Sequence, residues 1–82
     1  MVTVYYHPLF EKQVKKIKDG KVKQQIKRHI QKIVEDPEIG KPMKYDRRGT
    51  REVYISPFRL SYLYEKNNDH VILLSLYHKD EQ

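Results

Sequence analysis

The chain has 82 residues, with 17 Lys and Arg against 11 Asp and Glu, a net charge of +6 and no cysteine. This length predicts one small domain over residues 1–82, and the lack of cysteine excludes disulfides and thiolate metal sites. The basic balance favours a polyanionic partner, such as nucleic acid, or an acidic protein. The chain opens on a strand pattern without a basic leader, and no apolar run is long enough to span a membrane. We therefore expect a cytoplasmic protein that does not bind membranes.

The N-terminal half of the sequence predicts one strand followed by two helices. Residues 2–6 alternate β-branched and aromatic side chains, which indicates an edge or near-edge strand. A short helix should follow, with Gly20 as its C-cap, because three apolar residues recur at helical spacing: Phe10, Val14 and Ile17. A second apolar stripe between residues 22 and 34 predicts a longer helix that ends near Asp36.

The C-terminal half predicts an antiparallel meander. Residues 37–44 are rich in Pro and Gly and are expected to form a loop from the helices to the sheet. Three β-rich runs follow, at residues 51–55, 58–65 and 70–78, and the last is apolar enough to be covered on both faces. Each helix has one apolar stripe, so both must pack on one side of the sheet. The expected fold is a two-layer α+β domain, with an N-terminal strand, an αα-hairpin and a three- to four-stranded antiparallel sheet.

Arg59 stands out in the middle run of the meander. By alternation, Leu60 and Tyr62 face the core, so Arg59 projects from the opposite face. A guanidinium there needs water, a carboxylate or a phosphate, because burying it unpaired is costly. Strand geometry alone favours a pair with Glu52 and a phosphate contact equally. The expected core takes one face of each element: Val4, Phe10, Val14, Ile17, Ile26, Ile30, Ile33, Phe58, Leu60, Tyr62, Leu74 and Leu76.

The residues available for chemistry are Arg, Lys, His and Tyr. No metal-ligand spacing, Gly-rich phosphate loop or common hydrolase motif is present, so we expect neither a metal nor another cofactor. These side chains suit RNA cleavage, in which a base activates the 2′-hydroxyl, cations stabilise the phosphorane and an acid protonates the leaving oxygen. Arg59 is the candidate for holding phosphate, His78 for acid or base, and Lys79 for added positive charge. Alternatively, His78 is an ordinary histidine at a strand end and Lys79 is a solvated lysine.

Two groups of basic residues are candidates for contact with nucleic acid. The lysines of the two helices form a surface of one sign, which is either solvated or docked on phosphates. A second group lies near the proposed site and, together with a tyrosine, makes up the expected RNA-binding set: Lys41, Lys44, Arg47, Arg48, Arg51 and Tyr77. The tyrosine equally fits a half-buried position in the sheet.

The element order and three short motifs resemble those of one toxin family. The motifs are GKPMK at residues 40–44, FRLSYLYE at 58–65 and VILLSLYHKDE at 71–81. The most specific is the aromatic-Arg-apolar-x-Tyr signature at 58–62. In these features, and over nearly the whole chain, the sequence is similar to the RelE/ParE superfamily of type II toxin–antitoxin toxins.

The resemblance implies a toxin that enters the ribosomal A site, cuts the mRNA there and inhibits translation, with Arg59 as its phosphate-binding catalytic residue. The YoeB-like branch implies that His78 is the acid, and the RelE-like branch implies that Lys79 is a cation at the strand end. The implied partners are the ribosome, mRNA and an antitoxin with an acidic or amphipathic helix, whereas operator DNA binds only to the toxin–antitoxin complex. The alternatives are a ParE-like toxin that acts on DNA gyrase without nuclease activity and a non-catalytic nucleic-acid-binding module.

Some positions depart from the patterns of this family. RelE has two lysines where this chain has Thr50 and Glu52, YoeB has a glutamate base where this chain has Lys41, and its final tyrosine is replaced here by Lys79. The general base is therefore left open between Tyr54, Tyr77, a neutral lysine and the ribosome itself.

Overall fold

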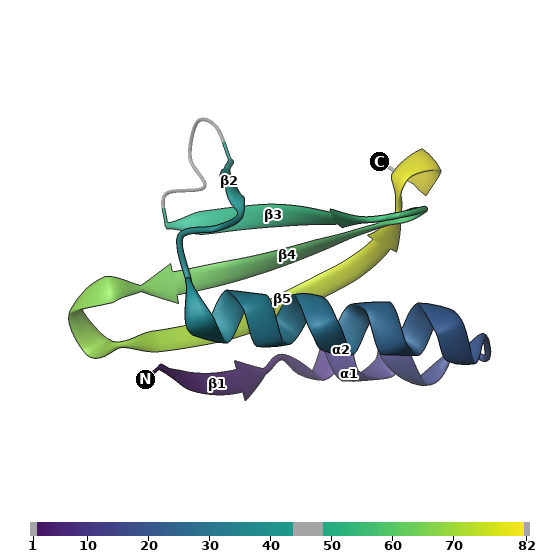
Figure 1. Ribbon diagram of the computed structural model, residues 1–82, viewed down its shortest axis with the longest axis horizontal. Helices are drawn as coiled ribbons and strands as arrows, with labels where there is room; N and C mark the ends of the chain where they lie inside the picture. The colour runs from purple at the N-terminus through teal and green to yellow at the C-terminus, as the bar shows by residue number, and fades with distance from the viewer. Residues whose placement is uncertain (1, 44–48, 82) are drawn as a thin grey trace.

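The computed structural model describes residues 2–43 and 49–81, which form a five-stranded sheet with two helices on one face (Figure 1). The elements in chain order are β1 (Thr3–Tyr6), α1 (Pro8–Lys15), α2 (Gly20–Glu35), β2 (Lys41–Pro42), β3 (Thr50–Ile55), β4 (Phe58–Glu65), the 3-10 helix Lys66–Asn68, β5 (His70–His78) and the 3-10 helix Lys79–Glu81. Within the described ranges, neither helix is long and apolar enough to cross a membrane.

The strand order across the sheet is β1-β5-β4-β3-β2. The meander of β3, β4 and β5 is antiparallel, which confirms the predicted α+β fold. β1 forms one edge, as predicted, and pairs in parallel with β5. The prediction of a loop over residues 37–44 is wrong at Lys41–Pro42, which pairs with β3 as the second edge strand. Proline fits there because an edge strand has one side without hydrogen-bonded neighbours.

The turn between the helices differs from the prediction that Gly20 caps the first helix. α1 ends at Lys15, and Gly20 is instead the first residue of α2. Asp19 is the N-cap of α2, and its carboxylate accepts a hydrogen bond from the Lys21 amide at 2.8 Å. An aspartate satisfies a free amide at a helix start, so Asp19 caps α2 and Gly20 becomes the first residue of the helix.

The core lies between the helices and one face of the sheet. Both helices contribute to one buried cluster, which is why both pack on the same face: Phe10, Ile26, Ile33, Ile55, Leu60, Tyr62, Val71, Leu73 and Leu76. Along β5 the residues between these, such as Ile72, are only half-buried, so the prediction that this strand is covered on both faces is wrong. We call the face opposite the helices the open face.

The prediction of Leu74 in the core is also wrong, because β5 contains a bulge. Ser61 of β4 pairs with Ser75, whereas the next residue, Tyr62, pairs with Leu73, so Leu74 is an extra residue in β5. An extra residue shifts the alternation of side chains by one. Leu73 is therefore fully buried, and Leu74 lines a pocket that also includes Ser61 and Ser75.

Tyr62 fastens the segment between α2 and β2 to the sheet. Its hydroxyl donates to the Pro37 carbonyl at 2.8 Å and accepts from the Gly40 amide at 2.9 Å. A Cβ on Gly40 would lie 2.6 Å from that hydroxyl, so only glycine fits. Arg51 adds hydrogen bonds to the carbonyls of Glu38 and Gly40 at 2.9 and 2.7 Å. Burial raises the pKa of Tyr62, which keeps its hydroxyl protonated as a donor.

Replacing Tyr62 by phenylalanine should therefore lower the free energy of unfolding by about 1–3 kcal/mol, because the Gly40 amide and the Pro37 carbonyl lose their partner in a buried position. Urea unfolding of the purified protein measures this change. Tyr64→Phe is the matched control on the same strand and face, and it should cost less. An equal loss in both variants would contradict the fastening role of Tyr62.

Candidate functional site

Arg59 is surrounded by polar side chains on the open face, near the end where β5 finishes. In register, Arg59 lies opposite Tyr54 of β3 and Tyr77 of β5, so the three side chains share one face. Glu52 lies two residues before Tyr54 in β3 and therefore projects from the same face. We call these four residues the Arg59 network.

The contacts of the Arg59 network centre on the carboxylate of Glu52. Arg59 Nη1 donates to Glu52 Oε1 at 2.8 Å, and the Tyr77 hydroxyl donates to Glu52 Oε2. The guanidinium carbon of Arg59 also lies 5.9 Å from the centroid of the Tyr54 ring, a cation–π distance. Glu52 keeps 16% of its side-chain surface exposed and Arg59 keeps 36%. The cation is thus the more accessible partner of the pair.

Arg59 retains donor capacity beyond this ion pair. Its Nε atom is buried and has no hydrogen-bond partner among the residues that the structure describes. The hydrogen bond to Glu52 raises the pKa of Arg59, and desolvation opposes that rise without reversing it, so the side chain is a permanent cation. The buried Nε is closed to solvent, but the exposed part of the guanidinium can donate to an oxyanion in the fork geometry typical of phosphate contacts.

Small side chains beside the network give it room on the sheet surface. Ser61 and Ser75 hydrogen-bond to each other across β4 and β5 at 2.6 Å. Because both side chains are short, the longer Tyr77 can reach over β4 to Glu52. Next to the serines a pocket of about 310 Å³ opens, lined by His7, Leu9, Met43, Thr50, Ser61, Leu74 and Ser75.

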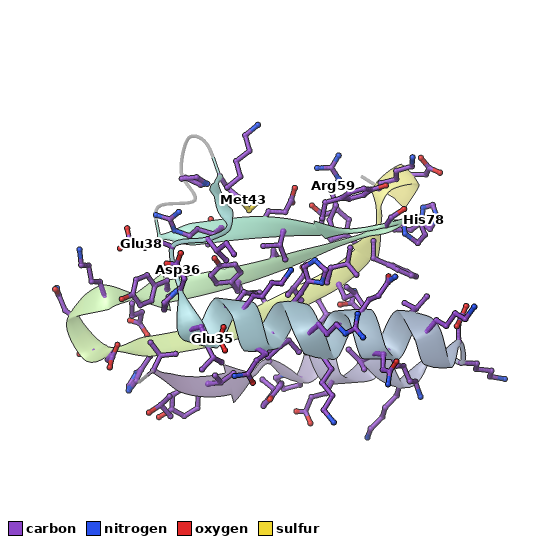
Figure 2. The ribbon with its side chains drawn as sticks, in the orientation of Figure 1. Glu35, Asp36, Glu38, Met43, Arg59 and His78 are labelled. Carbon is purple, nitrogen blue, oxygen red and sulfur yellow. The ribbon has the colours of Figure 1, made fainter. Side chains whose placement is uncertain are left out.

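His78 occupies the opposite face of the sheet. It pairs with Phe58 across β4, and the two rings make an edge contact with centroids 5.7 Å apart. Its Nδ1 accepts from the Asp80 amide at 3.2 Å and lies 3.5 Å from the Asp80 carboxylate. Arg59 and His78 are nevertheless at the same end of the sheet (Figure 2). Lys79 is exposed directly beyond the strand, so both catalytic assignments at the end of β5 stay predictions.

The predicted RNA-binding residues are divided between the two faces. Lys41 pairs with Glu52 in register and therefore lies on the open face beside the Arg59 network, to which Tyr77 itself belongs. Arg51 pairs with the buried Tyr62, and its guanidinium is bonded to backbone carbonyls of the segment before β2. Three residues of the set lie outside the described residues: Lys44, Arg47 and Arg48.

A family model described as the ParE toxin of the type II toxin–antitoxin system, parDE, matches residues 4–82. The chain belongs to the RelE/ParE toxin superfamily. No curated protein sequence matches this toxin significantly.

Solved structures agree on the fold of this RelE/ParE toxin. It is similar to a chain of the intact Escherichia coli RelBE toxin–antitoxin complex, with a TM-score of 0.83 and 18% identity over 95% of this chain and 96% of that one. A chain of the RelBE2 toxin–antitoxin complex from Mycobacterium tuberculosis has a TM-score of 0.81 and 19% identity, over 95% of this chain and 98% of that one. A YoeB/ParE toxin from Agrobacterium tumefaciens has a TM-score of 0.82 and 14% identity, over 94% of this chain and 98% of that one.

The place of Glu52 in the site of this toxin was predictable from the sequence only in part. Its pair with Arg59 was one of two open alternatives, and the structure confirms it. The contact with Tyr77 was not predicted, because it depends on the register between β4 and β5, which the bulge near Ser75 shifts. The small residues Ser61 and Ser75 were the sequence signal that a long side chain from β5 could cross β4 beside them.

Proposed function

We propose that this toxin is a ribosome-dependent endoribonuclease that cleaves mRNA in the A site and thereby inhibits translation. The observation that carries the proposal is the position of Arg59, a cation with 36% of its side-chain surface exposed on the open face. Lys41 and Tyr77 on the same face add a second cation and an aromatic ring for an RNA strand.

In this proposal Arg59 donates hydrogen bonds to the non-bridging oxygens of the scissile phosphate and so stabilises the charge that develops on the phosphorane. His78 protonates the leaving 5′-oxygen, and Lys79 adds positive charge beside it. His78 follows Tyr77, the partner of Arg59 in register, so it lies directly beyond the phosphate site along β5. The ring of His78 lies on the opposite face of the sheet from Arg59. The RNA strand would therefore pass over the end of the sheet to contact both side chains.

The proposed physiological partner is a cognate antitoxin. Similar toxins from Escherichia coli and Mycobacterium tuberculosis form toxin–antitoxin complexes. A net charge of +6 makes an acidic or amphipathic antitoxin helix the complementary partner for this chain. Operator DNA would be bound by the complex and not by the toxin alone.

The alternative is a toxin that acts on DNA gyrase without cutting RNA. The ParE description of the matching family favours it. The ion pair of Arg59 with Glu52 also favours it, because the pair gives the arginine a structural role. A nucleic-acid-binding module without catalysis would use the same ion pair.

The order in which synthesis stops after induction separates the two toxin functions. Cells that express the toxin without an antitoxin are pulse-labelled for protein and for DNA. A nuclease of translated mRNA should stop incorporation into protein first, while DNA synthesis continues. If DNA synthesis stops first while protein synthesis persists, the nuclease proposal is wrong and gyrase becomes the target.

A further inference from the structure

We propose that Glu52 is the general base of this cleavage, released for that role when the scissile phosphate replaces it on Arg59. The inference rests on the nuclease function proposed above and supplies the base that the family patterns leave unassigned in this chain. It starts from one observation: the carboxylate of Glu52 accepts hydrogen bonds from both Arg59, the candidate phosphate-binding residue, and the Tyr77 hydroxyl.

A phosphate and Glu52 compete for the same cation. Arg59 bonds to Glu52 through Nη1, and its greater exposure leaves the guanidinium open to an anion arriving from solvent. When phosphate takes the guanidinium, Glu52 keeps its hydrogen bond from the Tyr77 hydroxyl and therefore stays beside the phosphate. The carboxylate oxygen that Arg59 releases is then free to accept a proton. Tyr77 is thus a positioning residue for Glu52.

The order of residues along the open face matches the order of groups in a nucleotide. The pocket lined by Ser61 and Ser75 comes first, and Glu52 is the residue of β3 that pairs with Ser61. Arg59 lies two residues before Ser61, toward the start of β4. Two residues of a strand span about 7 Å. A nucleobase bound in the pocket would therefore place the ribose of that nucleotide at Glu52 and its 3′-phosphate at Arg59. The leaving 5′-oxygen would then point toward His78.

The chemical step balances with these groups. The 2′-hydroxyl gives its proton to the Glu52 carboxylate while the 2′-oxygen forms a bond to phosphorus. The bond between phosphorus and the 5′-oxygen breaks, and that oxygen takes a proton from the His78 imidazolium. The products are a 2′,3′-cyclic phosphate and a free 5′-hydroxyl. Glu52 returns its proton to solvent, and His78 regains one from it.

A role for Glu52 as an inhibitor of Arg59 and a role as the general base predict opposite changes in kcat when the carboxylate is removed. If the carboxylate only masks Arg59, its removal would free the guanidinium and speed cleavage. If it is the base, removal leaves phosphate binding intact or tighter and slows the chemical step. The direction of the change in kcat therefore separates the two roles.

The test compares Glu52→Gln with the wild-type toxin on ribosomes programmed with an mRNA. We expect kcat to fall by about 10²–10⁴-fold, the usual contribution of a general base, with KM unchanged or lower. The acid limb of the kcat–pH profile should disappear with the carboxylate, and Glu52→Asp should restore part of the rate. Glu35→Gln is the matched control, because Glu35 is exposed at the end of α2, far from Arg59 (Figure 2). It should cleave at the wild-type rate.

Wild-type or faster cleavage by Glu52→Gln would overturn the inference while the nuclease function stands. Intact mRNA with the wild-type toxin would instead refute the nuclease function itself. Should Glu52→Gln fail to fold, Tyr77→Phe gives a second test, since it keeps both the carboxylate and its pair with Arg59. It should lower kcat by about tenfold at unchanged KM, as expected for lost positioning of a base. An unchanged kcat in this variant would also overturn the inference.

Discussion

Cells that express Arg59→Ala are expected to keep growing, whereas the wild-type toxin arrests them. Removing one group that stabilises transition-state charge typically slows an enzyme by about 10²–10³-fold, which is enough to relieve arrest. The variant should still fold, because Glu52 keeps its hydrogen bond from Tyr77 and Arg59 itself is only half-buried. Colony counts after induction, with the protein level checked by blotting, measure the effect.

Two further variants show whether the loss is specific to the guanidinium. Arg59→Lys keeps the charge but loses the fork, so partial arrest is expected. Arg28→Ala removes an equal charge from the exposed face of α2 and should remain as toxic as the wild type. Full toxicity of a folded Arg59→Ala would refute the proposed mechanism.

The second large effect is on stability and concerns two adjacent leucines. Leu73→Ala should lower the free energy of unfolding by about 2–5 kcal/mol, because it leaves a cavity in a fully buried position. This loss is a large fraction of the total stability of a small domain. Leu74→Ala should cost clearly less, because Leu74 is half-buried and lines the pocket on the open face.

Urea unfolding of both leucine variants, followed by circular dichroism, measures the difference. Equal losses at the two positions would contradict the bulge in β5 and the register it sets. A larger loss for Leu74→Ala would mean that the alternation predicted from the sequence is the correct one.

The periodic parts of the fold were predictable from the sequence. The stripe from Val22 to Val34 and the alternation of β-branched and aromatic residues gave α2 and the strands of the meander, because these patterns depend only on neighbours in the chain. The bulge was not predictable, since Leu73, Leu74 and Ser75 fit either register equally well. β2 was missed for a similar reason, because a two-residue edge strand exists only through its partner β3.

The candidate site was predictable where it depends on one hairpin. The alternation in β4 placed Arg59 away from the core, and the short turn between β3 and β4 brought Glu52 within reach. The separation of Arg59 from His78 onto opposite faces follows from the register between β4 and β5, which the sequence does not reveal. The role of Tyr77 as a partner of Glu52 depends on that same register.

The most direct test of the nuclease account is primer extension on an mRNA translated in a reconstituted system. Wild-type toxin should produce new 5′ ends confined to the codon in the A site, and Arg59→Ala and His78→Ala should lose these cuts. Naked mRNA should be cleaved only weakly. Intact mRNA on translating ribosomes, or equal cutting by the Arg59→Ala variant, would contradict the account.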